Sequence, residues 1–335
     1  MKKNIALVAG GYSGESVISL RTAQTIRKNL DPAVYDVYPI VITRKSWYYA
    51  PNGEESGIEI DKNDFSLTLD EGRKIRFDAA FIAVHGTPGE DGRLQGYFDM
   101  VGIPYTTCNA IVSALTFNKK FCNSVVKDFG IVDIARSEHL TKEYPYSIGA
   151  ILENLKLPLF VKPAESGSSL GISKVKDVTQ LLPAINKAFE EDNQVLIEEF
   201  IEGRELTIGV YRTGDTIEVL PPTEIKSQNE FFDYEAKYTQ GVTQEITPAQ
   251  IPETVLEELR KKAAYIYRHL SCRGVVRIDF ILQKDTNRLF FLEVNTMPGQ
   301  SEASIIPQQV RAAGIDLQTF YGQLLQSVFK NVSRA

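Results

Sequence analysis

VVRIDFIL at residues 275–282, followed by LFFLEVN at residues 289–295, is the stretch that decides the fold of this 335-residue chain. Both runs are rich in β-branched and aromatic residues, which favour strands. The intervening residues 284–287 (KDTN) are turn formers. The pattern therefore predicts an antiparallel hairpin.

The two faces of this hairpin differ because successive side chains of a strand point to opposite sides. The apolar side is expected to hold Val276, Ile278, Phe280 and Leu282 on the first strand and Leu292 and Val294 on the second. The polar residues are Arg277 and Asp279 on the first strand and Glu293 and Asn295 on the second. If the connection is odd-numbered, or a bulge makes it so, all four meet on one face.

Such a polar face has the chemistry of a metal site. Two carboxylates and an amide oxygen beside one guanidinium suit Mg²⁺, which prefers oxygen ligands and keeps positions open for phosphate. The alternative is an amphipathic hairpin with a solvated polar face, because alternation is expected of any half-buried sheet. The rest of the chain decides between the two.

Composition excludes several classes of protein. The chain is 43% apolar and 24% charged, as in ordinary soluble globular proteins, and its length suits two or three domains. A net charge of −6 argues against nucleic-acid binding. No apolar run reaches the roughly 20 residues that span a membrane. The N-terminus lacks a secretory signal, and Cys108, Cys122 and Cys272 are too widely spaced for a disulfide framework or zinc site. We expect a cytoplasmic protein with reduced thiols.

The first hundred residues predict a doubly wound α/β unit. Residues 4–11 (NIALVAGG) form a buried-type strand ending in glycines, and a helix is expected from Ser13 to about Leu30. Further strands are expected at 37–42 and 79–84. The latter ends on HGTPGEDG at 85–92, a polar glycine-rich loop where α/β sheets bind ligands. His85 is as well explained by a structural role as by a ligand contact.

The middle of the chain carries two lysines with candidate roles. One helix is expected at 110–129, containing Lys119, although helical lysines are usually solvated. A short strand at 157–163 contains Lys162, and the glycine- and serine-rich loop 164–171 follows. Amides and an ammonium suit a flap over phosphates. It is not a Walker loop, and a plain flexible hairpin loop is the alternative.

Two later stretches indicate ligand contact. Glu198 and Glu199 interrupt an otherwise buried strand that begins at Gln194, and their oxygens can accept hydrogen bonds from an adenine amino group or a ribose. Residues 222–252 are polar and lack periodicity. A loop of this length in a compact domain is usually a lid, a binding loop or disordered, and its aromatic residues argue against disorder.

Taken together, these pieces resemble an ATP-grasp enzyme and, more narrowly, the D-alanine–D-alanine ligase family. The resemblance covers nearly the whole chain. The motifs that carry it are GGYSGE at 10–15, HGTPGEDG at 85–92, Lys162-Pro163 with GSSLG at 167–171, YEAKY at 234–238, Arg277-Ile278-Asp279, and EVNT at 293–296 with Pro298-Gly299. Each motif is weak alone, but six in the family's order make chance similarity very improbable.

The resemblance implies an N-terminal α/β domain (1–107), a central domain (108–197) and a C-terminal domain with the metal hairpin (198–335). ATP is gripped between the last two. The implied reaction phosphorylates one D-alanine carboxylate, and a second D-alanine attacks the acyl phosphate to give the dipeptide, ADP and phosphate for peptidoglycan synthesis. The resemblance implies a homodimer and implies no nucleic-acid or membrane partner.

The resemblance also implies binding sets for metal and nucleotide. Asp279, Glu293 and Asn295 would hold two Mg²⁺ ions, for which Mn²⁺ can substitute. The residues implied to contact ATP are Lys119, Lys162, Ser168, Ser169, Glu198, Glu199, Phe200, Ile201, Glu205 and Lys237. The two earlier lysines and the loop amides are implied to contact phosphates, and the glutamates at 198 and 205 to contact adenine and ribose.

For the substrates, the resemblance implies the catalytic residues Glu15, Ser168, Tyr238, Arg277 and Gly299. The implied D-alanine contacts are Glu15, His85, Lys237, Ser304 and Ile305. Glu15 would bind the first ammonium group and join the hydroxyls at 168 and 238, while the arginine and the glycine amide would stabilise the oxyanion. Lys237, Ser304 and the amide of Ile305 would hold the second carboxylate.

Two departures and three rivals remain at this stage. Val17 stands where the family often has a second acid, and Ala303 where it often has histidine, which leaves positioning of the second substrate open. The nearest rival is a ligase joining D-alanine to D-lactate or D-serine, against which Tyr238 argues because depsipeptide-forming relatives usually carry phenylalanine. The others are a different ATP-grasp carboxylate–amine ligase and a non-catalytic nucleotide-binding protein, which would not need Arg277.

Overall fold

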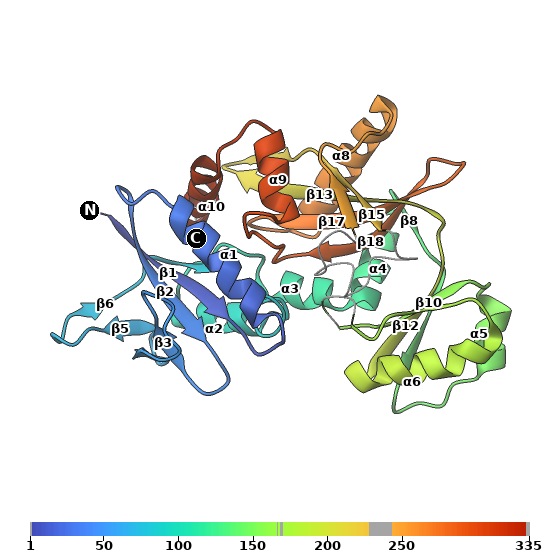
Figure 1. Cartoon of the computed structure of the whole chain (residues 1–335), viewed down its shortest axis with the longest axis horizontal. Coiled ribbons are helices and arrows are strands. Elements are labelled where there is room, and N and C mark those ends of the chain that lie inside the picture. Colours follow the sequence, from blue (N-terminus) through green and yellow to red (C-terminus); the bar gives the residue numbers. More distant parts are fainter. Residues whose placement is uncertain (1, 166, 168–169, 228–242, 333–335) are drawn as a thin grey trace.

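The computed structural model describes residues 2–165, 167, 170–227 and 243–332. Within these ranges the chain forms three sheets, which Figure 1 shows side by side along the long axis of the molecule. The N-terminal sheet lies at one end and the four-stranded central sheet at the other, with the C-terminal sheet between and above them. The architecture is α/β, as the sequence predicts.

The N-terminal sheet has the strand–glycine–helix opening expected from residues 4–30. Its order is β6-β5-β4-β3-β2-β1-β7, and the strands β2, β1 and β7 are parallel. The strands are β1 (Lys3–Gly10), β2 (Tyr35–Ile42), β3 (Trp47–Tyr49), β4 (Ile58–Asp61), β5 (Ser66–Thr68), β6 (Lys74–Ile75) and β7 (Ala79–Ile82). Helices α1 (Ser16–Asn29) and α2 (Arg93–Val101) accompany them. The short antiparallel strands β3 to β6 were not foreseen.

The central sheet is antiparallel and has its own small core. Its order is β11-β10-β12-β9, with strands β9 (Ser137–Thr141), β10 (Leu159–Pro163), β11 (Ser173–Val175) and β12 (Gln194–Glu199). The helical elements are α5 (Ile148–Asn154), the short 3-10 turn η1 (Val178–Gln180) and α6 (Leu181–Glu191). Apolar side chains of α6, including Ile185 and Phe189, pack on Val161 and Ile197 of the sheet. Within the described residues this cluster is separate from the other cores.

The C-terminal sheet contains the hairpin that the sequence predicts. Its order is β16-β15-β13-β17-β18-β8, and β14 pairs with β13 beside this path. The strands are β8 (Asp133–Ile134), β13 (Gly203–Thr213), β14 (Thr216–Val219), β15 (Thr223–Ser227), β16 (Thr243–Ile246), β17 (Val276–Gln283) and β18 (Leu289–Asn295). Helix α8 (Glu253–His269) packs its buried face, including Leu259 and Ile266, on this sheet. Helix α9 (Ile305–Ala312) follows the hairpin.

The single helix expected at 110–129 is instead two helices. Asn118 is extended (φ −85°, ψ 105°) and separates α3 (Ala110–Phe117) from α4 (Lys119–Asp128). Its side chain accepts a hydrogen bond from the backbone N–H of Phe121 at 3.0 Å and so caps α4. Lys119 therefore begins a helix rather than lying within one. Both helices pack on the C-terminal sheet through residues such as Val112 and Val126.

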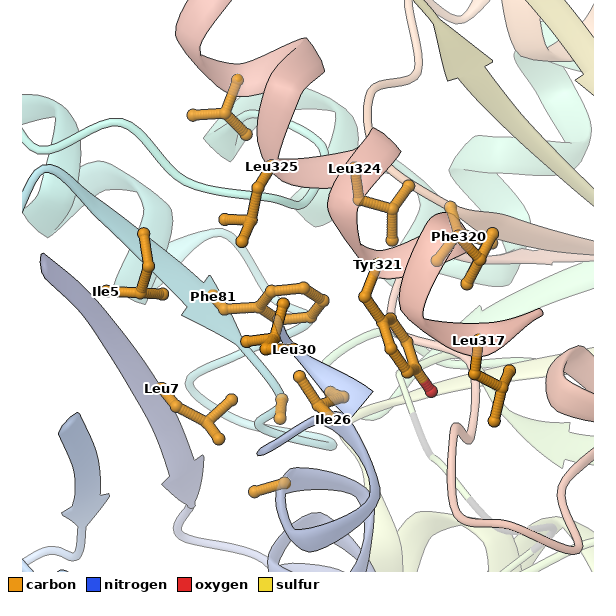
Figure 2. Close-up of a cluster of buried hydrophobic side chains, with 14 of the residues drawn as sticks. Ile5, Leu7, Ile26, Leu30, Phe81, Leu317, Phe320, Tyr321, Leu324 and Leu325 are labelled. Carbon is orange, nitrogen blue, oxygen red and sulfur yellow. The ribbon is translucent and has the colours of Figure 1, made fainter. Parts of the chain in front are cut away.

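The first and last parts of the chain share one hydrophobic core. Figure 2 shows side chains of helix α10 (Leu317–Val332) against the N-terminal sheet and α1, with Ile5, Leu7, Ile26, Leu30, Phe81, Leu317, Phe320, Tyr321, Leu324 and Leu325 labelled. The rings of Phe81 and Tyr321 meet edge to face with their centroids 5.9 Å apart. On the other side of α10, Phe320 meets the ring of Tyr211 in β13 at 5.1 Å. Helix α10 thus joins the N-terminal and C-terminal sheets.

Candidate active site

A β-bulge brings the four polar residues of the hairpin onto one face, as the sequence analysis required. Arg277 pairs with Asn295 and Asp279 with Glu293, and the register shifts between Asp279 and Phe280. Beyond the shift Phe280 pairs with Phe291, so Leu292 is the extra residue.

The bulge also corrects one expectation for the apolar side. Leu292 does not share the core face with Val294, because the extra residue moves it out of alternation. Phe291 takes the core position beside Val294, and Leu292 lines the cleft described below.

Arg277, which is half-buried, forms an ion pair with the buried Asp279 at the centre of this face. The guanidinium donates from Nε to Oδ1 at 2.9 Å and from Nη2 to Oδ2 at 2.7 Å. The hydroxyl of Thr207 in β13 donates to Oδ1 at 2.5 Å, and Asp279 is only 4% exposed. Burial alone lowers the pKa of Arg277, but the contact with Asp279 outweighs it and raises that pKa above its ordinary value. The guanidinium therefore stays charged at every physiological pH.

The donor set of this face fits a divalent cation. Glu293 Oε2 lies 3.5 Å from Lys119 Nζ, and Asn295 Oδ1 accepts from the N–H of Met297 at 3.1 Å. In the part of the chain described here, no group of three or more His, Cys, Asp or Glu side chains is arranged to hold a metal ion. A cation would therefore rely on two carboxylates and one amide oxygen, which are the hard oxygen donors that Mg²⁺ and Mn²⁺ accept.

The polar face opens into a cleft of about 990 Å³ to which all three sheets contribute. The N-terminal part supplies Glu15 and His85, and the central part supplies Lys162 and Glu198. The C-terminal part supplies most of the remaining lining, including Glu205, Arg277, Asp279, Glu293, Asn295, Gly299, Ser304 and Ile305. The cleft therefore unites predicted residues that lie up to 290 positions apart, as the spacing from Glu15 to Ile305 shows.

One end of the cleft has the character of a nucleotide site. Lys162 Nζ lies 2.5 Å from Glu198 Oε2, and the amide of Asn123 donates to Glu198 Oε1 at 2.9 Å. Apolar side chains, among them Phe160, Ile201, Ile281 and Leu292, line the same cleft. The carboxylate of Glu199 instead accepts from the backbone of Lys156 at 2.9 Å, so its side chain is held at the end of β10. An apolar slot bordered by a half-buried lysine and a buried carboxylate suits a purine base and its phosphates.

Glu15 stands where the N-terminal and central parts meet. A Cβ placed on Gly86 would lie 3.0 Å from Glu15 Oε2, and one placed on Gly167 would lie 2.8 Å from the same oxygen. Glycine at both positions therefore lets two loops close around this carboxylate. His85 Nε2 lies 3.1 Å from the hydroxyl of Thr22, and burial lowers the pKa of His85. His85 thus has both a structural partner and a position on the cleft.

The opposite end of the cleft is built around the start of α9. Ser304 is the residue before the helix, and its hydroxyl makes no capping bond but lies 2.6 Å from that of Ser301. A Cβ on Gly299 would lie 3.0 Å from Ser304 Oγ, so glycine lets these segments approach without displacing the serine hydroxyl. The first amides of α9, beginning with Ile305, lie at this lining. Helix N-termini bind anions, so this end suits a carboxylate.

Four predicted residues, Ser168, Ser169, Lys237 and Tyr238, lie outside the described residues, as does most of the expected lid at 226–245. The flanks of that lid, β15 and β16, pair as a hairpin.

The structure adds cleft residues that the sequence analysis did not select, among them Glu90, Arg204, Glu224 and Glu245. Burial, and then the nearby Glu15, raise the pKa of Glu90 to about 8. Glu90 lies within the HGTPGEDG motif, so that loop was the available signal. Arg204 donates two hydrogen bonds, of 2.8 and 2.7 Å, to the carboxylate of Glu224. The sequence does not show this pair, because the two residues meet only through the pairing of β13 with β15.

Two largely antiparallel sheets with a cleft of about 990 Å³ between them, and a hairpin bearing paired carboxylates at its wall, define an ATP-grasp ligase. Two family profiles match the chain, "D-ala D-ala ligase N-terminus" over residues 4–108 and "D-ala D-ala ligase C-terminus" over residues 125–326. The chain belongs to the D-alanine–D-alanine ligase family.

Individual relatives agree over the full length. The D-alanine--D-alanine ligase of Parabacteroides distasonis is 47% identical over 332 residues, 99% of each chain. The structure of the VanG D-Ala:D-Ser ligase from Enterococcus faecalis superimposes with a TM-score of 0.86 at 31% identity and covers 98% of this chain and 100% of that one. The Bacillus anthracis D-alanine--D-alanine ligase complexed with ATP gives 0.76 at 28% identity and covers 99% and 98%.

None of the helices in the described ranges combines the length and the apolar character needed to cross a membrane. The longest of them, α8, carries charged residues throughout its 17 positions.

Proposed function

We propose that this chain uses ATP to join two D-alanine molecules through a D-alanyl phosphate, giving D-alanyl-D-alanine, ADP and phosphate for peptidoglycan precursor synthesis. Membership of the ligase family supports the reaction type. The observation that carries the proposal is the cleft in which two lysines, an apolar slot and the polar hairpin face meet. Such a cleft supplies positioning and charge neutralisation, which are most of what phosphoryl transfer requires.

The nucleotide is proposed to lie between the central and C-terminal sheets. Lys119 and Lys162 would contact its phosphates, and Glu198 and Glu205 its adenine and ribose, with the backbone from Glu199 through Phe200 to Ile201 along the base. In support, Lys119 and Lys162 each stand against a cleft carboxylate, so both ammonium groups already point into the site. Ser168, Ser169 and Lys237 complete the proposed set from sequence alone.

Asp279, Glu293 and Asn295 are proposed to hold the divalent cations, two Mg²⁺ ions or Mn²⁺ in their place. Bound there, the cations would neutralise phosphate charge. The chain itself prepares the site by holding Asp279 between Arg277 and Thr207, so that its carboxylate cannot rotate freely. The ion pair of Glu293 with Lys119 would hold the proposed metal and phosphate contacts close to each other.

The two amino acids are proposed to occupy opposite ends of the polar face. Glu15 would bind the ammonium group of the first D-alanine beside His85, and Ser168 and Tyr238 would join Glu15. Ser304, the amide of Ile305 and Lys237 would hold the carboxylate of the second. Its amine attacks the acyl phosphate carbon, phosphate leaves, and Arg277 with the amide of Gly299 stabilises the oxyanion. The arginine suits this role because it lines the cleft and is permanently charged.

The three segments 1–107, 108–197 and 198–335 are proposed as the functional domains. The separate hydrophobic core of the central sheet supports the division, and within the second segment α3 and α4 pack on the C-terminal sheet. A homodimer and a cytoplasmic location are proposed as well; consumption of ATP supports the latter.

A second candidate is a ligase that takes D-serine as its second substrate. The likeness to the D-Ala:D-Ser ligase of E. faecalis favours it specifically. The two activities differ only in the side chain accepted at the second subsite, so the same residues would serve both.

One coupled assay tests the proposal. ADP release is followed with D-alanine, L-alanine, D-alanine plus D-serine, and D-alanine plus D-lactate, and the products are separated by chromatography. We expect turnover with D-alanine alone and D-alanyl-D-alanine as the main product of each D-alanine mixture. A main product containing serine or lactate would replace the proposal by a rival, and no ADP release with any mixture would refute it.

A further inference from the structure

Gln309 in α9 is a buried polar side chain for which the reaction scheme above has no role. It is 0% exposed, and both ends of its amide are engaged. Its Oε1 accepts from the backbone N–H of Gly209 at 2.9 Å. Its Nε2 donates to the carbonyl of Thr207 at 2.9 Å and to the hydroxyl of Thr223 at 3.1 Å. One side chain therefore ties α9 to β13 and β15 together.

The position of Gln309 along α9 gives these bonds a consequence for the cleft. The helix has eight residues, and its first residue and the serine before it form the end of the cleft suited to a carboxylate. A helix of this length has little stability of its own and takes its orientation from packing. Gln309 lies about one turn beyond Ile305, so its bonds set where the helix start points.

The hydrogen bonds of Gln309 also connect α9 to the polar face of the hairpin, through Thr207. Thr207, whose carbonyl accepts from Gln309, donates its hydroxyl to Asp279 at 2.5 Å. Thr207 is itself fully buried. Three residues thus link the start of α9, strand β13 and the carboxylate beside Arg277 in one solvent-free chain of hydrogen bonds.

The fit around Gly209 shows that this contact is tight. A Cβ placed there would lie 2.8 Å from Gln309 Oε1 and 2.8 Å from Ile306 Cδ1, both in α9. Glycine lets α9 approach the strand without displacing these side-chain ends, so that the hydrogen bond from the Gly209 N–H to Gln309 can form. Gly209 in β13 and Gln309 in α9 therefore suit the same distance between the helix and the sheet.

We propose that Gln309 is a positioning residue that fixes the second-substrate subsite relative to the reacting centre. The inference rests on the proposed function, since it assigns the start of α9 to the carboxylate of the attacking D-alanine. Gln309 touches neither substrate. It sets the distance between the bound nucleophile and the acyl phosphate by holding α9 against β13.

A general core role would weaken folding and impair every step alike, whereas a positioning role is specific to the second half of the reaction. Two readouts separate the halves. Hydroxylamine can replace the amino-acid nucleophile and trap the acyl phosphate as a hydroxamate, which reports ATP and the first D-alanine only. Dipeptide formation at increasing D-alanine reports the second subsite.

The test compares Gln309→Met with wild type. Methionine fills a similar volume but makes none of the three hydrogen bonds. We expect the second-site KM for D-alanine to rise about tenfold, the effect of roughly one lost buried hydrogen bond or more. Hydroxamate formation and the KM for ATP should stay within about twofold. Gln323→Met is the control. It removes the hydrogen bond that the hydroxyl of Tyr211, also in β13, donates to Gln323 in α10, away from the cleft.

Gly209→Ala approaches the same contact from the strand and decides the matter if Gln309→Met does not fold. The added methyl group should push α9 outward and reproduce the rise in second-site KM with intact hydroxamate formation. Equal loss of both activities in the variants, or an unchanged second-site KM, would overturn the positioning role. A wild-type enzyme that forms hydroxamate but no dipeptide would instead refute the proposed function.

Discussion

Leu292 shows how one residue decides what the hairpin can bind. Phe280 pairs with Phe291, and with strict alternation Asp279 would then pair with Leu292. The extra residue in β18 lets Asp279 pair with Glu293 instead, so that both carboxylates lie on one face. The alternation of each strand could be read from the sequence, and so could the need for a bulge or an odd connection. The bulge's position could not, because it depends on which of Phe291 and Leu292 fills the core better.

Neutralising either carboxylate should abolish ligation, but with different effects on stability. Glu293→Gln should lower kcat/KM by at least tenfold, about 1.4 kcal/mol of transition-state stabilisation, with little change in unfolding. Asp279→Asn should lose activity and also about 1–3 kcal/mol of stability, because it leaves the half-buried Arg277 without its counter-charge. Steady-state kinetics and urea unfolding measure the two effects. Activity above a tenth of wild type at saturating Mg²⁺ would remove that residue from the ligand set.

Glu90 should make stability fall as pH rises. Its folded pKa, about 8, lies above that of an ordinary glutamate, so between these values the folded state binds more protons than the unfolded state. The free energy of unfolding should therefore fall between about pH 5 and pH 8, by on the order of 1–3 kcal/mol from this group. Glu90→Gln, which stays neutral, should flatten the curve in urea unfolding at several pH values. Parallel curves for the two proteins would contradict this.

Among the elements, the α3–α4 break shows why a helix boundary can hide in a sequence. The apolar pattern of residues 110–129 continues across the break, because both helices pack on the same sheet. Asn118 is a strong N-cap residue and was the available signal. Its second function could not be foreseen: its amide donates to Glu165 at 2.8 Å, across to the central part of the chain.

Asn118→Ala should therefore affect both folding and nucleotide binding. Loss of the cap should cost about 0.5–2 kcal/mol in unfolding free energy. Because Lys119 begins α4 and its N–H bonds to the carbonyl of Ala164 at 3.0 Å, the KM for ATP should also rise. Asn109→Ala is the control, since Asn109 caps α3 in the same way at 3.0 Å but lies apart from the lysine. An equal rise in the KM for ATP in both variants would contradict the positioning of Lys119 by Asn118.

At the scale of the whole molecule, one hydrophobic core of the described residues is shared between two sheets, and another is confined to a single sheet. Helix α10 makes the N-terminal and C-terminal sheets one packed body, whereas the central sheet has its own core. The amphipathic pattern of residues 317–332 indicates a buried face, but it does not say that the partner lies some 300 residues away. Pairings at such separation are set by topology and are beyond a reading of local periodicity.

Core truncations should separate these two bodies. Leu324→Ala should cost about 2–5 kcal/mol and should weaken amide protection in both β1 and β13, because α10 packs between the two sheets. Ile185→Ala, in the core of the central sheet, should weaken protection in β10 and β12 while leaving β1 unchanged. Hydrogen exchange resolved by segment measures both. Loss of protection confined to the C-terminal sheet in Leu324→Ala would contradict the shared core.

The position of α10 in the fold also affects when each part of the chain can complete its core during synthesis. The face of the N-terminal sheet that includes Ile5, Leu7 and Phe81 is covered in part by the final helix, so it stays incompletely covered while the ribosome makes almost all of the remaining chain. The central sheet, by contrast, has all of its strands and helices between residues 137 and 199 and can close on itself as soon as these emerge. A chain that stops short of α10 would thus release its oldest segment with exposed apolar surface, the state that chaperones and proteases recognise.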